Sequence, residues 1–214
     1  HAAAALAALM PADGFRDGVV WPDGPPADQR LADYFRRHPA LGKRDRRWIA
    51  DRVFDVLRQG ALYRAFAGGA SPTPADLIEV SRAAEADDGA AVGRFADTCP
   101  EALRYSLPAW LWERLEASHP GGEAAAIAAA LLRPAPVDLR CNLLRGRPEA
   151  LRQALAERGI DALPVAGAST ALRVAGRAAL ERLDLFEQGW FEPQDAGSQM
   201  IADACGARRG ERIV

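Results

Sequence analysis

The feature that most constrains the fold is a change of hydrophobic period at Pro136. In the segment 137–143, apolar residues alternate with polar ones, which is typical of a half-buried strand. The apolar members are Val137, Leu139, Cys141 and Leu143, and the polar members are Asp138, Arg140 and Asn142. Before Pro136 the apolar residues recur every three or four positions, as in amphipathic helices. The chain therefore predicts a helical region followed by a region that contains a sheet.

The helical region is expected over residues 1–134, as a compact bundle. Its clearest helix runs from Arg46 to Leu62, with Ile49, Val53, Phe54 and Leu57 on one face and Arg47, Asp51, Asp55 and Arg58 on the other. Thr73-Pro74 predicts a helix N-cap followed by proline at the first helical position. Two more helices are expected after Leu107-Pro108 and over Glu123–Leu132, whereas the segment Trp21–Pro26 is too rich in proline to be helical.

A small α+β domain resembling an RNA-recognition fold is expected over residues 135–188. After the strand at 137–143, Pro148–Arg158 predicts a helix with Leu151 and Leu155 facing inward. Ala162–Val165 and Ala171–Val174 predict two strands, and Ala178–Glu187 a further helix. This order of elements favours a sheet covered by helices.

The remaining residues, 189–214, predict a short strand, a helix and the start of another strand. Asp195 is a suitable N-cap, with Ser198 three residues later, and Gly206 a suitable helix stop. The expected apolar face of this helix consists of Met200, Ile201, Ala204 and Cys205. Ile213 and Val214 begin a strand, so we expect residues 189–214 to be the first elements of a larger α/β domain.

Composition excludes several classes of protein. The chain has 214 residues and a net charge of −2, and no apolar run approaches the roughly 20 residues that span a bilayer. The three cysteines, Cys99, Cys141 and Cys205, have neither CxxC nor Cys/His spacing, which argues against a disulfide framework and against a zinc site. We expect a cytoplasmic protein without a metal, and we expect each cysteine to be a small buried apolar residue.

A basic segment is the clearest charge feature. It contains Arg36, Arg37, His38, Lys43, Arg44, Arg46, Arg47 and Arg52, opposed only by Asp45 and Asp51. Two interpretations are open: a surface for RNA phosphates, or a solvated helix face with local pairs such as Arg47 with Asp51. Two interpretations are also open for the tryptophans Trp48, Trp110 and Trp112. They could stack on bases, but their spacing with leucines favours core packing.

Four motifs in order carry a resemblance to a known family. They are Lys43-Arg44-Asp45-Arg46-Arg47, Leu107-Pro108-Ala109-Trp110, Pro136-Val137-Asp138-Leu139-Arg140-Cys141-Asn142, and Phe191-Glu192-Pro193-Gln194-Asp195-Ala196-Gly197-Ser198-Gln199. The chain resembles the N-terminal part of the bacterial Sun or Fmu (RsmB) ribosomal RNA (cytosine-5) methyltransferases, truncated before the loop that binds S-adenosylmethionine. The resemblance implies a NusB-like helical domain, an RNA-recognition-like domain and a Rossmann-like catalytic domain.

In that family a cysteine thiolate adds to C6 of cytosine, which makes C5 nucleophilic toward the methyl group of S-adenosylmethionine. The resemblance places the cofactor loop, the carboxylate that binds the ribose and both reactive cysteines after the strand that begins at Ile213. Cys99, Cys141 and Cys205 match none of the catalytic positions, so we assign no catalytic residue. We expect this chain alone to be inactive and to bind no cofactor.

The resemblance and the residues together give the candidate sites. RNA binding is assigned to Arg44, Arg46, Arg47, Arg140 and Asn142, with a solvated sheet face as the alternative for the last two. Gln194, Asp195 and Ser198 are expected beside the cofactor pocket, with helix capping as the alternative for Asp195. The expected partner is ribosomal RNA, with neither DNA nor a membrane, and the chain is expected to be a monomer.

Two other functions are open at this stage. One is a NusB-like, non-enzymatic RNA-binding protein of the antitermination type, which accounts for the helical part but not for the strand at Ile213. The other is a purely structural interaction module, which the near-neutral net charge allows. Salt-dependent RNA binding separates the methyltransferase region and the NusB-like protein, which both bind RNA, from the structural module.

Overall fold

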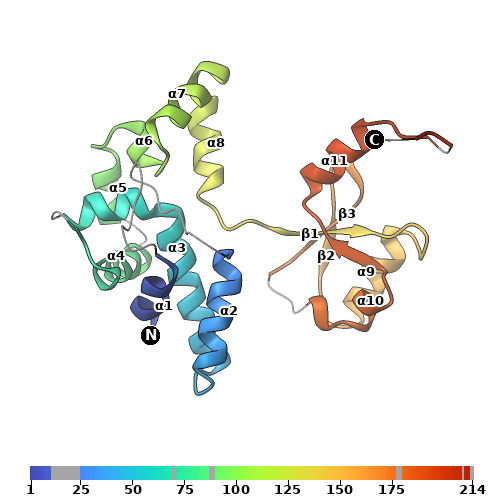
Figure 1. Ribbon diagram of the computed structural model, residues 1–214. Helices are drawn as coiled ribbons and strands as arrows, with labels where there is room; N and C mark the ends of the chain where they lie inside the picture. Colours follow the sequence, from blue (N-terminus) through green and yellow to red (C-terminus); the bar gives the residue numbers. More distant parts are fainter. Residues whose placement is uncertain (11–24, 69–70, 87–89, 177–179, 209, 213–214) are drawn as a thin grey trace. The chain divides into compact units, whose positions relative to one another are not determined.

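The computed structural model describes residues 1–10, 25–68, 71–86, 90–176, 180–208 and 210–212 (Figure 1). These residues form two compact units, His1–Arg133 and Pro134–Val214, each with its own apolar core. Most of the proline-rich segment Trp21–Pro26 and the expected strand start at Ile213 and Val214 lie outside the described residues.

The first unit consists of helices, as the sequence predicts. They are α1 (Ala2–Leu9), α2 (Ala27–Arg37), α3 (Lys43–Ala67), α4 (Pro74–Ala86), α5 (Ala90–Ala96), α6 (Glu101–Arg104), α7 (Ala109–Ser118) and α8 (Glu123–Leu131). The long helix α3 packs against α1 and α4, and its residues Val53 and Val56 are fully buried in the core. The predicted helix Arg46–Leu62 lies inside α3, whose backbone is kinked at Gln59.

The start of α4 confirms the predicted cap. The Asp76 amide donates to Thr73 Oγ1 at 3.3 Å, and the Asp76 carboxylate accepts from the Thr73 amide at 2.8 Å, which is a capping box. The bonds from the Thr73 amide and hydroxyl lower the pKa of Asp76, because they favour the charged carboxylate. The buried face of α4 carries Leu77, Ile78 and Val80.

The second unit contains a four-stranded antiparallel sheet with the order β2-β3-β1-β4. The strands are β1 (Val137–Cys141), β2 (Ala162–Val165), β3 (Ala168–Val174) and β4 (Phe191–Pro193). The accompanying helices are α9 (Pro148–Ala156), the 3₁₀ turn η1 (Leu180–Arg182), α10 (Asp184–Glu187) and α11 (Ala196–Ala204). On one face of the sheet, Leu151 and Leu155 of α9 are fully buried against Leu139 and Leu172.

The second face of the sheet is covered by α11, which changes the expected burial of β1. Ala196 of α11 packs with Ala168 and Ala171 of β3. Asp138, expected on the polar face of a half-buried strand, is only 4% exposed as a result. The strand ends at Cys141, and Leu143, expected to face the core, is 62% exposed in the following loop. The half-buried strand predicted over 137–143 is therefore shorter and is buried on both faces at Asp138.

Two predicted helices also differ. In the region predicted as one helix over Ala178–Glu187, the described residues form η1 and α10, separated by Leu183 in an extended conformation. In α11 the expected apolar face is exposed, with Met200 at 45% and Ile201 at 72%, whereas Ala196 and Gln199 are buried. The polar residue Gln199 takes the inward position because its amide has partners there, as described below.

Residues 189–214, expected to open a third domain, contribute β4 and α11 to the second unit. Strand β4 pairs with β1, joining Phe191 to Cys141 and Glu192 to Arg140. Among the described helices of both units, none is long and apolar enough to cross a bilayer.

Candidate nucleic-acid interface

Cationic side chains gather where α2 ends and α3 begins. Arg36 and Arg37 lie in the last turn of α2, and Lys43, Arg44, Arg46 and Arg47 lie in the first two turns of α3. We call these six residues the basic corner. The Gly42 amide donates to the Asp45 carboxylate at 3.0 Å, which fixes the start of α3. This capping bond defines where α3 begins within the basic corner.

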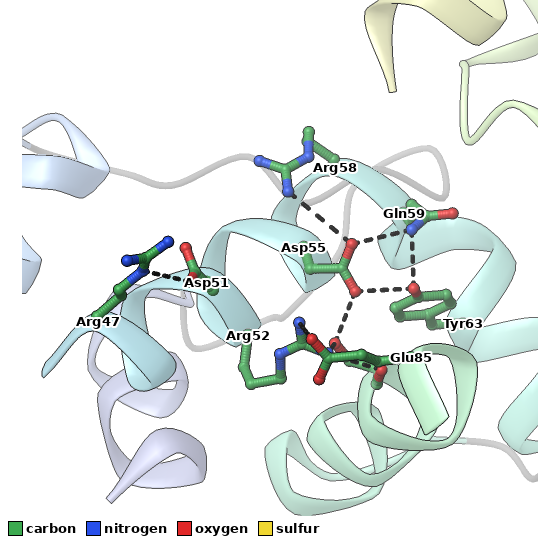
Figure 2. A network of polar contacts seen from close by, with 9 residues as sticks. Arg47, Asp51, Arg52, Asp55, Arg58, Gln59, Tyr63 and Glu85 are labelled. Atoms are coloured by element: carbon green, nitrogen blue, oxygen red, sulfur yellow. Dashed lines mark hydrogen bonds and ion pairs between the residues drawn. The ribbon is translucent and has the colours of Figure 1, made fainter. Parts of the chain in front are cut away.

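Three of these cations are available to a ligand. Among the described residues, the exposed side chains of Lys43 and Arg44 have no hydrogen-bond or ion-pair partner. Arg47 lies 3.8 Å from the Asp51 carboxylate and its side chain is 74% exposed, so this pair is weak (Figure 2). Cations at a helix N-terminus are repelled by the helix dipole, and an anion bound there relieves that repulsion.

The other three cations have structural partners. Arg46 Nε donates to the Leu41 carbonyl at 2.8 Å, and its guanidinium lies 5.7 Å from the Phe35 ring centroid. Arg36 pairs with the Asp33 carboxylate, and Arg37 Nε donates to the Asp33 carbonyl at 3.4 Å. Arg46, assigned to RNA from the sequence, therefore joins the two helices of the basic corner.

The exposed tryptophans correct the core assignment made from spacing. Trp48 on α3 is 43% exposed and Trp110 on α7 is 54% exposed. Trp112 is half-buried and stacks on Tyr105, with ring centroids 5.6 Å apart. Leucine spacing predicted burial for all three, but among the residues that the structure describes only Trp112 stacks on an aromatic neighbour.

A polar network that the sequence did not predict joins α3 to α4 (Figure 2). The Asp55 carboxylate accepts from Ser81 Oγ at 2.6 Å, from the Tyr63 hydroxyl at 2.8 Å and from Gln59 Nε2 at 3.0 Å. Arg52 Nη1 donates to the Ser81 carbonyl at 2.9 Å. The spacing of Asp55, Gln59 and Tyr63, one helical turn apart, is the sequence signal for this network.

The network also perturbs an ionisable group. Burial of Tyr63, followed by the Asp55 charge beside it, raises its pKa above the ordinary value. Next to these residues lies a cavity of about 410 Å³, lined in part by Arg52, Leu62 and Tyr105. We assign the network a structural role, because its carboxylate is fully used by internal donors.

The two candidate RNA residues near the sheet have internal partners. Arg140 Nη2 donates to the Glu192 carboxylate at 2.6 Å across the β1–β4 pair. Asn142 Nδ2 donates to the Gly189 carbonyl at 2.8 Å, and its Oδ1 accepts from the Leu144 amide at 3.1 Å. The Asn142 amide therefore holds the loop after β1, whereas Arg140 remains partly exposed, at 44% for its side chain.

The three residues expected near a cofactor pocket have different surroundings. The Asp195 carboxylate accepts from the Ser198 amide at 3.2 Å, so it caps α11, as its alternative interpretation holds. Within the described part of the chain, the buried Gln194 Oε1 has no hydrogen-bond partner. One unused acceptor does not make a site for S-adenosylmethionine, so these residues do not fit the whole cofactor.

Asp138 is the principal buried charge of the second unit and was not singled out from the sequence. Its carboxylate accepts from Arg173 Nε at 2.7 Å and Nη2 at 2.9 Å, and from the Ala196 amide at 3.2 Å. The Arg173 hydrogen bond lowers the Asp138 pKa, with a further lowering from the Ala196 amide, against the opposing effect of burial. Arg173 and Ala196 connect β1 to β3 and to the start of α11.

Gln199 makes the second polar connection to α11. Its Nε2 donates to the Gln194 carbonyl at 3.0 Å, and its Oε1 accepts from Thr170 Oγ1 at 2.8 Å. Gln199 is 2% exposed. Both ends of the amide are satisfied, which explains why a polar residue occupies the inward face of α11.

The cysteines lie in three different environments. Cys141 is buried, and burial, followed by the Glu149 charge, raises the pKa of its thiol. Cys99 is half-buried, and Cys205, expected to be buried, is exposed because its side of α11 faces solvent. A raised thiol pKa lowers the fraction of thiolate, so Cys141 is a poor nucleophile at neutral pH.

Comparison with known proteins finds similarity to one family of methyltransferases. Residues 107–181 match the model for the ferredoxin-like domain of RsmF/B-like methyltransferases. The ribosomal RNA small subunit methyltransferase B of Pectobacterium carotovorum subsp. carotovorum (strain PC1) is 36% identical over 110 residues, which cover 51% of this chain and 25% of that protein. The probable ribosomal RNA small subunit methyltransferase B of Synechocystis sp. is 32% identical over 111 residues, which cover 51% of this chain and 25% of that protein.

A solved structure supports the fold. The crystal structure of PH0851 matches with a TM-score of 0.57 and 16% identity, covering 80% of this chain and 49% of that one. The sequence matches, which cover about half of this chain, support its assignment to the N-terminal region of the RsmB/Sun family of RsmF/B-like methyltransferases. It spans about a quarter of the length of the curated relatives that it matches.

Proposed function

We propose that this chain is the RNA-binding N-terminal region of an S-adenosylmethionine-dependent ribosomal RNA (cytosine-C5) methyltransferase. The observation that carries the proposal is the set of exposed cations Lys43, Arg44 and Arg47 at the start of α3, of which the first two have no partner among the described residues. The names of the relatives support ribosomal RNA as the partner. In this proposal the protein is a cytoplasmic monomer that binds neither DNA nor a membrane.

Three domains make up the proposed architecture. The helical unit is a NusB-like RNA-binding domain over 1–134, and residues 135–188 with strands β1 to β3 are an RNA-recognition-like domain. Residues 189–214, whose strand β4 pairs with β1 of that domain, start a Rossmann-like methyltransferase domain. S-adenosylmethionine supplies the methyl group in the whole protein. This chain contributes RNA binding through Arg44 and Arg47, with Arg140 as a further contact, and we expect it to be inactive alone.

The family match weighs against the NusB-like antitermination alternative. It begins at Leu107, before α7, and continues to Glu181 in the second unit. A free-standing NusB-like protein would account for the helices alone. A match that joins the last helices to the sheet supports a multi-domain methyltransferase instead.

RNA binding by the basic corner is tested with Arg44→Gln/Arg47→Gln. We expect the double variant to bind a fluorescein-labelled fragment of small-subunit ribosomal RNA more weakly at low salt. The slope of log affinity against log salt should fall by about 2, because each lost phosphate contact removes about one released counterion. Fluorescence anisotropy between about 50 and about 200 mM KCl measures both quantities.

The matched control removes two exposed arginines elsewhere in the helical unit, Arg94 on α5 and Arg114 on α7. Arg94→Gln/Arg114→Gln changes the net charge by the same amount. We expect this control to retain the wild-type salt slope. Equal losses in the two double variants would show that net charge, and not the basic corner, determines binding.

A further inference from the structure

Trp48 lies in the second turn of α3, beside a groove between α3 and α4. The groove has a volume of about 330 Å³ and is lined by Trp48, Glu79, Arg82, Ala83, Glu85 and Ala86. This volume is at the lower end of the range for small-molecule sites. A tryptophan that is 43% exposed at the wall of such a groove presents an aromatic surface to a planar ligand.

The charges that line the groove are locally balanced. Arg82 Nη1 donates to both Glu79 carboxylate oxygens, at 3.0 and 2.8 Å. Glu85 pairs with Arg52 at 3.1 Å, and the Arg52 side chain is only 10% exposed (Figure 2). Because each carboxylate has an arginine partner, the groove favours a neutral planar group over a phosphate.

The available cations of the basic corner are next to this groove. Arg44 is one helical turn before Trp48, so the two side chains lie on the same side of α3. Arg47 directly precedes Trp48, and its side chain is 74% exposed. An aromatic wall next to the exposed cations Arg44 and Arg47 can recognise the two parts of a nucleotide: the base, by stacking, and the phosphate, by ion pairing.

We infer that Trp48 is a base-stacking residue and that the groove between α3 and α4 receives one unstacked base of the RNA that the basic corner binds. The inference rests on the proposed RNA-binding function and names the part of the RNA that is recognised: a single-stranded nucleotide. Stacking contributes affinity without adding a counterion, whereas Arg44 and Arg47 determine the salt dependence. The two contributions are therefore separable by measurement.

The test compares Trp48→Phe and Trp48→Leu with wild-type protein on a labelled single-stranded RNA. Phenylalanine keeps an aromatic face, whereas leucine keeps an apolar side chain without one. We expect Trp48→Leu to weaken binding by about 5- to 100-fold with an unchanged salt slope, and Trp48→Phe to retain most of the affinity. The control Trp110→Leu removes another exposed tryptophan, 54% exposed on α7, and should bind as wild type does.

A fluorescence titration provides a readout that does not require Trp48→Leu to fold. Stacking of a base on Trp48 should quench part of the wild-type tryptophan emission, and Trp48→Phe should lose that quenching while still binding RNA. Wild-type affinity in Trp48→Leu, equal weakening in Trp48→Phe and Trp48→Leu, or the same quenching in Trp48→Phe would each overturn the inference. Absence of RNA binding by the wild-type chain would overturn the proposed function itself, which is a distinct result.

Discussion

At the scale of single residues, Asp138 is a buried charge that connects β1 to β3 and to the start of α11. Its side chain is 1% exposed and accepts hydrogen bonds from Arg173 and from the Ala196 amide. We expect Asp138→Asn to lower the free energy of unfolding by roughly 1.5–3 kcal/mol, since bonds to a charged group are lost and buried donors remain. Solvent screening makes the lower part of this range the better expectation for the loss of stability, because the Arg173 side chain is 47% exposed.

Chemical denaturation of the wild type and Asp138→Asn at neutral pH measures this difference. The matched control is Asp184→Asn, which removes the carboxylate of the Arg158–Asp184 pair, where both side chains are more exposed than Asp138. We expect a much smaller change in the control. If Asp138→Asn and Asp184→Asn lost equal free energy of unfolding, burial would not explain how much each ion pair stabilises the fold.

The lowered pKa of Asp138 gives this ion pair a defined pH dependence. A carboxyl whose folded pKa is depressed stabilises the fold above its ordinary pKa, about 3.9, and the stabilisation is lost as pH falls through the folded pKa. We expect the difference in stability between wild type and Asp138→Asn to shrink as the pH is lowered below about 4. A difference that stays constant down to about pH 2 would contradict this assignment.

At the scale of elements, variants of Asp195 measure how much its N-cap stabilises α11. Its carboxylate accepts from the Ser198 amide at 3.2 Å. We expect Asp195→Ala to lower the free energy of unfolding by about 1 kcal/mol and Asp195→Asn to leave it nearly unchanged, because asparagine is an equally good N-cap. Thermal unfolding followed by circular dichroism measures the stability of both variants. Equal destabilisation by Asp195→Ala and Asp195→Asn would show that the carboxylate charge, and not the capping hydrogen bond, stabilises the helix.

Elements set by local signals were predictable from the sequence. Thr73 and Asp76 form the expected capping box, and Leu151 and Leu155 of α9 face inward at the predicted spacing. Asp195 caps α11 as its position suggested. Each of these features depends on residues within a few positions of one another, so the sequence contains the required information.

Features that depend on distant elements were not predictable. Asp138 is buried because α11 covers the second face of the sheet, and its partner Arg173 is 35 residues away. Trp48 has the spacing of a core residue but lies beside a groove instead of inside the bundle. Periodicity identifies a face of an element, whereas the partner of that face comes from tertiary packing.

At the scale of the whole molecule, the two units have separate cores, and each holds a buried ionisable group with a shifted pKa. The core around α3 and the core between α9 and the sheet share no residue. Asp138 makes the second unit sensitive to acid. Tyr63 makes the first sensitive to base, because its pKa is raised by burial and by Asp55. Above about pH 10 the unfolded tyrosine loses its proton while the folded one keeps it, so the stability of the first unit falls as pH rises.

We therefore expect two unfolding transitions, each of which responds to its own variant. In scanning calorimetry, Asp138→Asn should lower the transition of the second unit at neutral pH and reduce its shift below about pH 4. Tyr63→Phe should reduce the shift of the first unit's transition above about pH 10 and leave the second unit's transition unchanged. A single transition that both variants and both pH extremes move together would show that the units unfold as one, and the two cores would then have to be treated as a single cooperative structure.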